Sequence, residues 1–330
     1  MVRVNMKAAG LLVSLSLIAV LSVCLSISVG STSLRPDAVF TALIGGHDSI
    51  VREVILNLRL PRTLNAFCIG GLLALAGVLM QVLLRNPLAD PYVLGISGGA
   101  AVAALGVMLL GFGGFIIDGA AGLGALGATL LVFALAHARG GWTPQRLLLN
   151  GVVVASGCTA VVGLMLALGD ETRLRGMLFW LMGDLSFAPF SPLALGMLLA
   201  MGGLATAGAR DLNVLARGEI ETQSLGLALA PARIALFGAT AALTATAVTT
   251  AGGIGFIGLV TPHLVRLAAG GDHRIVVPAS ILLGGTLLTV ADMFARIVAA
   301  PRQLPVGALT ALIGVPLFLV LMRRDRRISS

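Results

Sequence analysis

The residues best placed to do chemistry in this sequence are three aspartates inside or beside long apolar runs. They are Asp118, Asp184 and Asp292. A carboxylate within a membrane is energetically costly and usually functional, and a carrier driven by protons or ions is expected to hold such acids near the membrane midplane. These three lie near the outer ends of the segments predicted below. An ion-coupled secondary transporter is therefore an alternative that stays open but that these acids support only weakly.

Other catalytic machinery is missing from the sequence. A phosphate-binding P-loop needs the pattern GxxxxGK[ST], and the only lysine of the chain is Lys7. The sequence contains neither an HExxH motif nor a pair of histidines of the kind that would indicate a metalloenzyme. Cys24, Cys68 and Cys158 each lie in an apolar run without the spacing of metal ligands. We therefore expect a chain that is not an enzyme, holds no metal and binds no cofactor of its own.

Short polar turns between apolar runs are the most distinctive local pattern. Residues 59–62 (RLPR) precede one apolar run, and residues 84–91 (LRNPLADP) follow it, ahead of residues 94–100 (LGISGGA). The two prolines of the middle segment end a helix, and its Asn and Asp side chains can bond the backbone locally. Taken as physics alone, this pattern predicts a rigid turn.

The apolar runs that these turns connect must be membrane helices. The 330 residues are 58% hydrophobic and 11% charged, whereas charged residues normally make up about a quarter of a soluble domain. Backbone groups in lipid must bond within a helix or a closed barrel, and these runs lack the alternation of barrel strands. The sequence therefore predicts an all-α polytopic membrane protein in one domain, residues 1–330. The net charge of +8 forms no basic stripe beside aromatic residues, so we expect no nucleic-acid partner.

Apolar length predicts the number of spans, because roughly 20 apolar residues cross a bilayer core of ~30 Å. On that measure we expect about ten transmembrane helices. They cover residues 8–29, 63–84, 93–110, 115–136, 147–168, 192–208, 232–250, 254–268, 275–298 and 305–321. A further apolar stretch, residues 176–186, is only about half a span and predicts a half-helix that lines a cavity.

Basic residues predict the orientation. With the amino terminus in the cytoplasm, fourteen of the 22 Lys and Arg residues fall on inside segments and the other eight fall outside. This is the bias that the positive-inside rule expects. Both termini are then predicted to face the cytoplasm.

Compared as strings, the polar turns resemble a known family. The segments at 59–62, 84–91 and 94–100 are similar to those of the FecCD family, the permease subunits of bacterial ABC importers for iron complexes and cobalamin. Further segments match in order. They are residues 146–151 (RLLLNG), 179–183 (FWLMG), 212–219 (LNVLARGE), 255–263 (GFIGLVTPH) and 304–307 (LPVG). The resemblance covers about residues 36–322.

The resemblance implies a type II ABC importer permease fold in the bacterial inner membrane. It also implies partners: a second copy of the chain around a central pathway, two ATPase subunits that bind ATP and Mg on the cytoplasmic side, and a periplasmic substrate-binding protein. The missing P-loop agrees with an ATPase on another chain.

The resemblance assigns roles to two groups of residues at the ends of the helices. Arg59, Arg62 and Arg296 match an outer rim that docks the binding protein, and arginines that reach the lipid headgroups are the simpler alternative. Residues 210–226 match a cytoplasmic segment that couples to the ATPase. The residues expected to couple are Leu212, Leu215, Arg217, Gly218 and Glu219.

Two further groups belong to the gate and the pathway. The residues that match the cytoplasmic gate, unless they are plain turn residues, are Asn86, Thr143, Pro144 and Gln145. The residues expected along the translocation pathway are Arg173, Arg175, Phe179, Trp180 and Met182. Two copies of the paired arginines would give a positive vestibule suited to anionic cargo, unless the acids at 170 and 171 neutralise them. We therefore expect a permease for haem or a ferric siderophore, with a cobalamin permease and a secondary transporter as alternatives.

Overall fold

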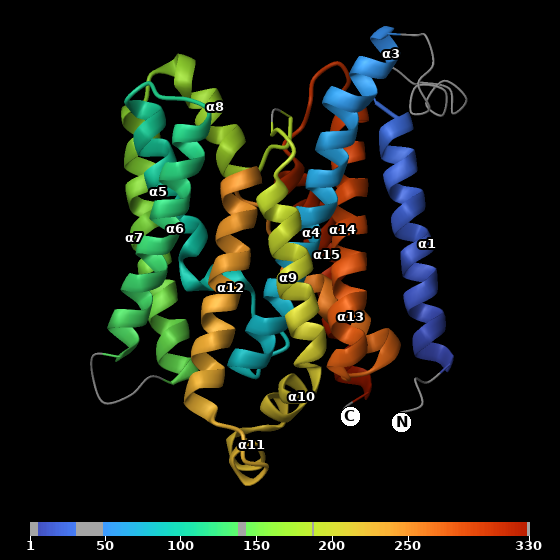
Figure 1. Cartoon of the computed structure of the whole chain (residues 1–330). Helices are drawn as coiled ribbons and strands as arrows, with labels where there is room; N and C mark the ends of the chain where they lie inside the picture. Colours follow the sequence, from blue (N-terminus) through green and yellow to red (C-terminus); the bar gives the residue numbers. More distant parts are fainter. Residues whose placement is uncertain (1–5, 31–48, 138–142, 187, 329–330) are drawn as a thin grey trace.

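The structure is a computed structural model that describes residues 6–30, 49–137, 143–186 and 188–328. Every regular element within these ranges is a helix, as predicted (Figure 1). The long helices are α1 (Met6–Ser28), α4 (Leu60–Leu84), α5 (Ile96–Leu109), α6 (Phe115–His137), α7 (Pro144–Leu168), α9 (Pro192–Ala207), α12 (Leu229–Ala251), α13 (Ile257–Ala269), α14 (His273–Ile297) and α15 (Val306–Ile328). The short ones are α3 (Ser49–Glu53), the π-helix η1 (Val54–Arg59), the 3-10 helix η2 (Pro91–Leu94), α8 (Glu171–Leu181), α10 (Ala209–Arg217) and α11 (Glu219–Ser224).

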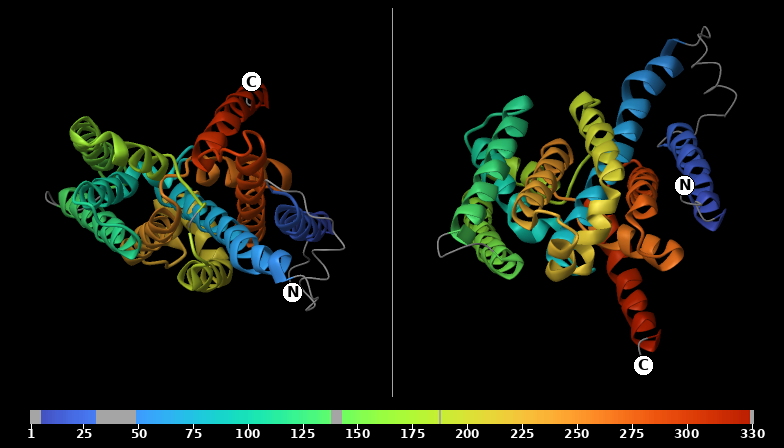
Figure 2. Two further views of the ribbon diagram at one scale, coloured as in Figure 1. Left: turned by 90° about the horizontal axis from the view of Figure 1, so that it is seen from above. Right: turned by 60° about the horizontal axis from the view of Figure 1, so that its bottom comes forward.

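The bundle has two ends, which we call the α8 end and the α11 end. Figure 1 shows α8 at one end, and α10 and α11 at the other. α1 begins and α15 finishes at the α11 end as well, so the described chain enters and leaves the bundle on the same side (Figure 1). In Figure 2, α5, α6 and α7 pack together on one side of α12, and α1 packs against α14 on the other side of the bundle.

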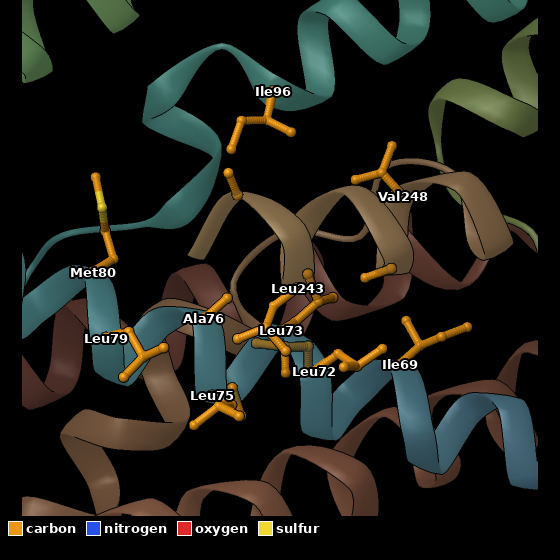
Figure 3. Close-up of a cluster of buried hydrophobic side chains, with 14 of the residues drawn as sticks. Ile69, Leu72, Leu73, Leu75, Ala76, Leu79, Met80, Ile96, Leu243 and Val248 are labelled. Carbon is orange, nitrogen blue, oxygen red and sulfur yellow. The ribbon is translucent and has the colours of Figure 1, made fainter. Parts of the chain in front are cut away.

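The central element is α4, and its sequence explains why. Apolar residues occupy all of its faces, which is typical of a helix that is buried all round. Of its 25 residues, 20 are buried. Figure 3 shows Leu73 of α4 beside Leu243 of α12, and Val248 of α12 and Ile96 of α5 belong to the same buried cluster. A Cβ atom placed on Gly77 would lie only 1.9 Å from the carbonyl oxygen of Gly258, so α4 and α13 meet backbone to backbone.

The predicted spans correspond to helices, but the number of crossings is not fixed. Among the described residues, six helices are long and apolar enough to cross a membrane, and a seventh is reached if α9 and α10, bent by 65° at their junction, form one span. Three predicted spans appear as shorter apolar helices, Ile96–Leu109, Ile257–Ala269 and Val306–Leu321. The prediction of about ten crossings therefore stays a prediction, whereas the all-helical class is confirmed for the described residues.

The predicted half-helix exists, but its position is corrected. Residues 176–186 were expected to be helical, and the helix observed is α8, Glu171–Leu181. Apolar composition begins only at Gly176, yet the helix starts earlier with an acidic residue in its first turn, where a negative charge is favourable. It ends before Gly183, whose φ of +77° is left-handed. Arg173 and Arg175 consequently lie within the helix and not ahead of it.

Candidate functional site

A large cavity lies between α6, α8, α12 and the start of α9. Its volume is about 1350 Å³. Aromatic side chains form one part of the lining: Phe115, Phe179, Trp180 and Phe190. Polar and charged side chains form another: Asp118, Thr172, Arg175, Asp184, Ser186, Ser191, Thr246, Thr249, Thr250 and Gln303. A cavity of this kind offers flat apolar surfaces together with a few fixed polar groups, which is the usual character of a small-molecule site.

Three of the five predicted pathway residues line this cavity. They are Arg175, Phe179 and Trp180. The Arg175 guanidinium carbon lies 5.6 Å from the centre of the Phe179 ring, within the range of a cation–π contact. Arg173 donates instead to the main-chain carbonyls of Met108 and Leu109 at the end of α5. Met182 is 37% exposed and is not part of the cavity wall.

The charge of the cavity wall differs from the positive vestibule expected from sequence. One arginine, Arg175, and two aspartates, Asp118 and Asp184, line it. The Asp184 carboxylate accepts a hydrogen bond from the Ser186 main-chain N–H at 2.8 Å, which orients it beside the cavity. The cavity within one chain is therefore more acidic than basic, and a positive vestibule between two copies stays a prediction.

Backbone segments cross beside the cavity wall at Gly252, without side chains between them. The Val306 N–H donates to the Gly183 carbonyl at 3.0 Å, which joins the start of α15 to the residue after α8. A Cβ atom on Gly252 or Gly307 would lie 2.1 or 2.2 Å from a carbonyl oxygen at the end of α8. Only glycine permits so close an approach at these positions. The end of α8 is thereby held against the segment between α12 and α13.

Asp292 joins two of the predicted docking arginines in a buried cluster at the α8 end. Its side chain is fully buried. Arg62 on α4 donates to its carboxylate from Nε at 3.0 Å and from Nη2 at 2.7 Å. The Nε of Arg296, one turn further along α14, lies 3.2 Å from its second oxygen. Arg296 also donates to the Ser26 carbonyl and hydroxyl at 3.0 and 2.6 Å. The cluster therefore ties α1, α4 and α14 together.

Arg59, the third predicted docking arginine, is also buried. Its Nη1 donates to the main-chain carbonyls of Ile27 and Ser28 at 3.0 and 2.9 Å. Arg59, Arg62 and Arg296 are each only 7% exposed. In a single chain these arginines therefore hold the ends of helices together, and no contact tests the predicted docking role.

The cluster continues to the cavity wall through Gln303. The side-chain oxygen of Gln303 accepts hydrogen bonds from Arg62 Nη1 and from the Ser186 hydroxyl, both at 2.7 Å. Sequence reasoning missed Gln303 and Ser186, because nothing in their local pattern indicates a partner more than one hundred residues away. The only available signal was the position of Gln303 directly before the LPVG segment.

The predicted coupling segment forms two short helices at the α11 end. Leu212 and Leu215 of α10 are buried, at 5% and 8% exposure, whereas Arg217 is exposed. Gly218 separates the helices with a φ of +130°, which favours glycine. Glu219 begins α11 and forms ion pairs with Arg85 and Arg233.

The same segment exposes two large apolar side chains among its polar ones. Ile220 and Leu225 are 83% and 64% exposed. The side chains of Ile220 and Leu225 point outward, while those of Leu212 and Leu215 pack inward. The segment therefore has apolar side chains on the inside of the chain and on its outer surface.

The four predicted gate residues occupy two separate turns. Asn86 is exposed, and its side chain accepts a hydrogen bond from the Leu88 N–H at 2.9 Å. The Thr143 hydroxyl caps α7 by accepting from the Arg146 N–H at 3.3 Å. Pro144 is buried at the first position of α7, and Gln145 is exposed. Each turn is explained by local bonds, so a gating role stays a prediction.

Asp272 attaches α10 to the start of α14. Its carboxylate accepts from the Asn213 side chain at 2.8 Å and from the Arg274 N–H at 3.0 Å. Burial alone raises the pKa of Asp272, but these hydrogen bonds and the nearby charges of Arg274 and His273 outweigh it and hold the pKa below its usual value. The coupling segment is therefore fixed to the bundle at the α14 side as well.

The architecture and the sequence both match known transporters. The profile of the FecCD transport family matches residues 18–324. The hemin transport system permease protein HmuU of Yersinia pestis is 40% identical over 289 residues, which cover 83% of this chain and 84% of that protein. The vitamin B12 import system permease protein BtuC of Escherichia coli O9:H4 (strain HS) is 36% identical over 320 residues, covering 96% and 95%.

A solved structure agrees with the fold. A metal-chelate type ABC transporter in an inward-facing conformation superposes with a TM-score of 0.85 at 31% identity, covering 96% of this chain and 99% of that one. The similarity therefore includes the helices that line the cavity and those that form the buried arginine cluster. Together with the profile match, it shows that this chain belongs to the FecCD transport family and is an ABC importer permease.

Proposed function

We propose that this permease carries an iron complex across the bacterial inner membrane into the cytoplasm, with haem ahead of a ferric siderophore. The observation that carries the choice of cargo is the cavity wall, where Arg175 lies beside Phe179 and Trp180. Aromatic faces suit a flat ring system, and a guanidinium suits the carboxylates at its edge. The volume of about 1350 Å³ exceeds that of typical small-molecule pockets.

Cobalamin is the second candidate cargo. Its support is the similarity to BtuC, a vitamin B12 import system permease protein, which extends over nearly the whole chain. The mixed charge of the wall, with Asp118 and Asp184 facing the same space as Arg175, also suits a cargo that carries little net charge. Haem, a flat anion, should depend on Arg175 more strongly than cobalamin, a bulky complex with little net charge. The effect of changing Arg175 on uptake therefore distinguishes the two cargoes.

The ATPase contact is proposed at the α11 end. Ile220 and Leu225 present apolar side chains to the outside, and an apolar group at the centre of a contact surface is typical of an interface anchor. The predicted cytoplasmic side is also the α11 end, because Arg85, Arg217 and Arg233 lie at the ends of α4, α10 and α12 that face α11. Two such chains, two ATPases and one binding protein at the α8 end make up the proposed importer.

The cargo is tested with the cognate substrate-binding protein. Purified binding protein is mixed separately with haemin, a ferric siderophore and cyanocobalamin, and its absorption spectrum is recorded after removal of unbound ligand. A Soret band after haemin treatment is the expected result. Retention of cyanocobalamin alone would replace haem by cobalamin as the cargo.

The energy source is tested in proteoliposomes. We expect uptake to require ATP and the partner ATPase and to be indifferent to a proton gradient. Uptake that continues without ATP and stops when the gradient is collapsed would replace the importer by an ion-coupled carrier.

A further inference from the structure

Glu219 stands where three elements of the α11 end meet. It is the first residue of α11. One carboxylate oxygen, Oε1, accepts a hydrogen bond from Arg85 Nη2 at 2.9 Å and another from Arg233 Nη2. Arg85 directly follows α4, and Arg233 lies in the second turn of α12. A single side chain therefore connects the segment proposed to contact the ATPase with two helices of the bundle.

The backbone fixes the position of this carboxylate. The break between α10 and α11 falls at Gly218, whose φ of +130° sets the direction in which α11 begins. The fully buried Thr222 closes the break, since its hydroxyl donates to the Gly218 carbonyl at 2.5 Å. Leu215 packs inward on the other side of the break. Glu219 is thus presented to the two arginines by an ordered turn.

The ion pairs are too exposed to be explained as stabilising contacts alone. The side chains of Glu219, Arg85 and Arg233 are 43%, 39% and 14% exposed. Ion pairs at such partly solvated sites contribute little to the free energy of unfolding, typically about 0–1 kcal/mol. Their geometry, with one acid between two bases from different helices, instead restricts how α11 can move relative to α4 and α12.

α4 is the helix through which such a movement would spread. Backbone contacts at Gly70 and Gly77 hold α4 against α14 and α13, so it moves as one body with them. Its far end carries Arg62, which bonds Asp292 and, through Gln303, reaches the cavity wall. A displacement applied at Arg85 is therefore connected through packed, bonded groups to the wall of the cavity.

We propose that Glu219 is a positioning residue that transmits movement of α10 and α11 to α4 and α12 through Arg85 and Arg233. The inference rests on the proposed contact between the α11 end and the ATPase. Nucleotide-driven closure of the ATPase moves α11, the two ion pairs carry α4 and α12 with it, and the cavity wall responds. The two ion pairs thus raise the uptake per ATP hydrolysed and contribute little to the free energy of unfolding.

The test compares Arg85→Gln, Glu219→Gln and the double variant in the full importer, with its ATPase and binding protein, in proteoliposomes. ATP hydrolysis and the uptake of haemin or cyanocobalamin, whichever the wild-type complex carries, are measured together. Each single variant is expected to lower uptake per ATP hydrolysed by roughly 2- to 30-fold, the range of measured coupling effects. The double variant is expected to be no worse than Glu219→Gln alone, because that change already removes the pair with Arg85 as well as the pair with Arg233.

Arg146→Gln is the matched control, since it removes an exposed arginine from the start of α7 at the same end of the bundle. Assembly with the ATPase is followed by size-exclusion chromatography for every variant. Wild-type uptake per ATP in both single variants would overturn the inference, and so would loss of assembly or losses that add in the double variant. Failure of the wild-type complex to couple uptake to ATP would instead overturn the proposed function, and the inference with it.

Discussion

Arg62 on α4 and Asp292 on α14, 230 positions apart in the chain, form a buried ion pair with a shortest N–O distance of 2.7 Å. Arg296 approaches the same carboxylate from the other side. One acid therefore serves two bases where water cannot reach it, and removing the acid leaves two guanidinium groups buried without their counter-charge.

Asp292→Asn is expected to destabilise the fold strongly. The amide keeps the shape but removes the charge, and breaking a buried ion pair typically costs about 3–5 kcal/mol. Thermal unfolding in detergent is the measurement, with Asp170→Asn as the control because Asp170 is exposed and makes no side-chain cap bond to α8. An unchanged melting temperature for Asp292→Asn would mean that solvent or lipid headgroups already reach the cluster.

Gly77→Ala tests the backbone contact between α4 and α13. The added methyl group would lie 1.9 Å from the Gly258 carbonyl oxygen, and forcing atoms into a packed core typically costs about 1–3 kcal/mol or more. We expect poor expression or a large fall in melting temperature. Gly127→Ala on α6 is the matched control, since nothing lies within 4 Å of its added Cβ. Equal behaviour of the two variants would contradict the close packing of these helices.

Trp180→Ala tests whether the cavity holds the cargo. Trp180 lines the cavity, and loss of its ring removes a stacking surface for a flat ligand. Reduced haemin uptake with normal assembly is expected. Leu178→Ala on the same helix serves as the control because Leu178 is 39% exposed and does not line the cavity. Equal uptake by both variants would place the cargo elsewhere.

Arg59→Gln and Arg296→Gln test the predicted docking role. If these arginines meet acids of the binding protein, their loss should slow association and weaken its salt dependence. Binding kinetics on the assembled importer provide the measurement, with Arg274→Gln at the opposite end as the control. Variants that fold normally and dock at the wild-type rate would leave the arginines with the structural role given by their bonds to α1.

Acid should loosen α10 from α14. The folded-state pKa of Asp272 lies below the value of about 3.9 for an unfolded chain, so its contribution is present above that pH and is lost as the pH falls through the folded pKa. The protection factors of the α10 amides, which are exchange rates corrected for the intrinsic effect of pH, should therefore fall as the pH drops below about 4. Asp272→Asn should abolish that fall, and wild-type protection factors that stay constant below about pH 4 would refute the assignment.

Local signals predicted the helices well because each depends on neighbouring residues. Apolar length identified every long helix of the described residues, and the prolines of residues 84–91 marked the end of α4. α8 was placed five residues too late, since the sequence signal used was hydrophobicity and the helix begins with Glu171 and other polar residues. The number of membrane crossings could not be predicted in the same way. Whether a short apolar helix crosses the membrane depends on the helices packed around it, and apolar length alone does not give those neighbours.

Contacts between distant residues could not be predicted from one sequence. Asp292 was considered only as an ion-coupling acid, and its pairing with Arg62 depends on α4 and α14 lying side by side. The burial of Arg59 likewise depends on a distant segment, because its guanidinium bonds the Ile27 carbonyl at the end of α1. The motif at 212–219 marked Glu219, but its partners Arg85 and Arg233 come from two other helices. Motifs thus identified residues, and packing assigned their partners.

The contact between Gly70 and Gly284 limits how this protein can change. A Cβ on Gly70 would lie 2.2 Å from the Gly284 carbonyl oxygen, and a Cβ on Gly284 would lie 2.5 Å from that of Gly70. A larger residue at either position cannot be rescued by a smaller one opposite, because glycine is already the smallest residue. Variants that separate α4 from α14 therefore have no single-site suppressor within this contact, and a screen for suppressors should recover only changes that move a whole helix.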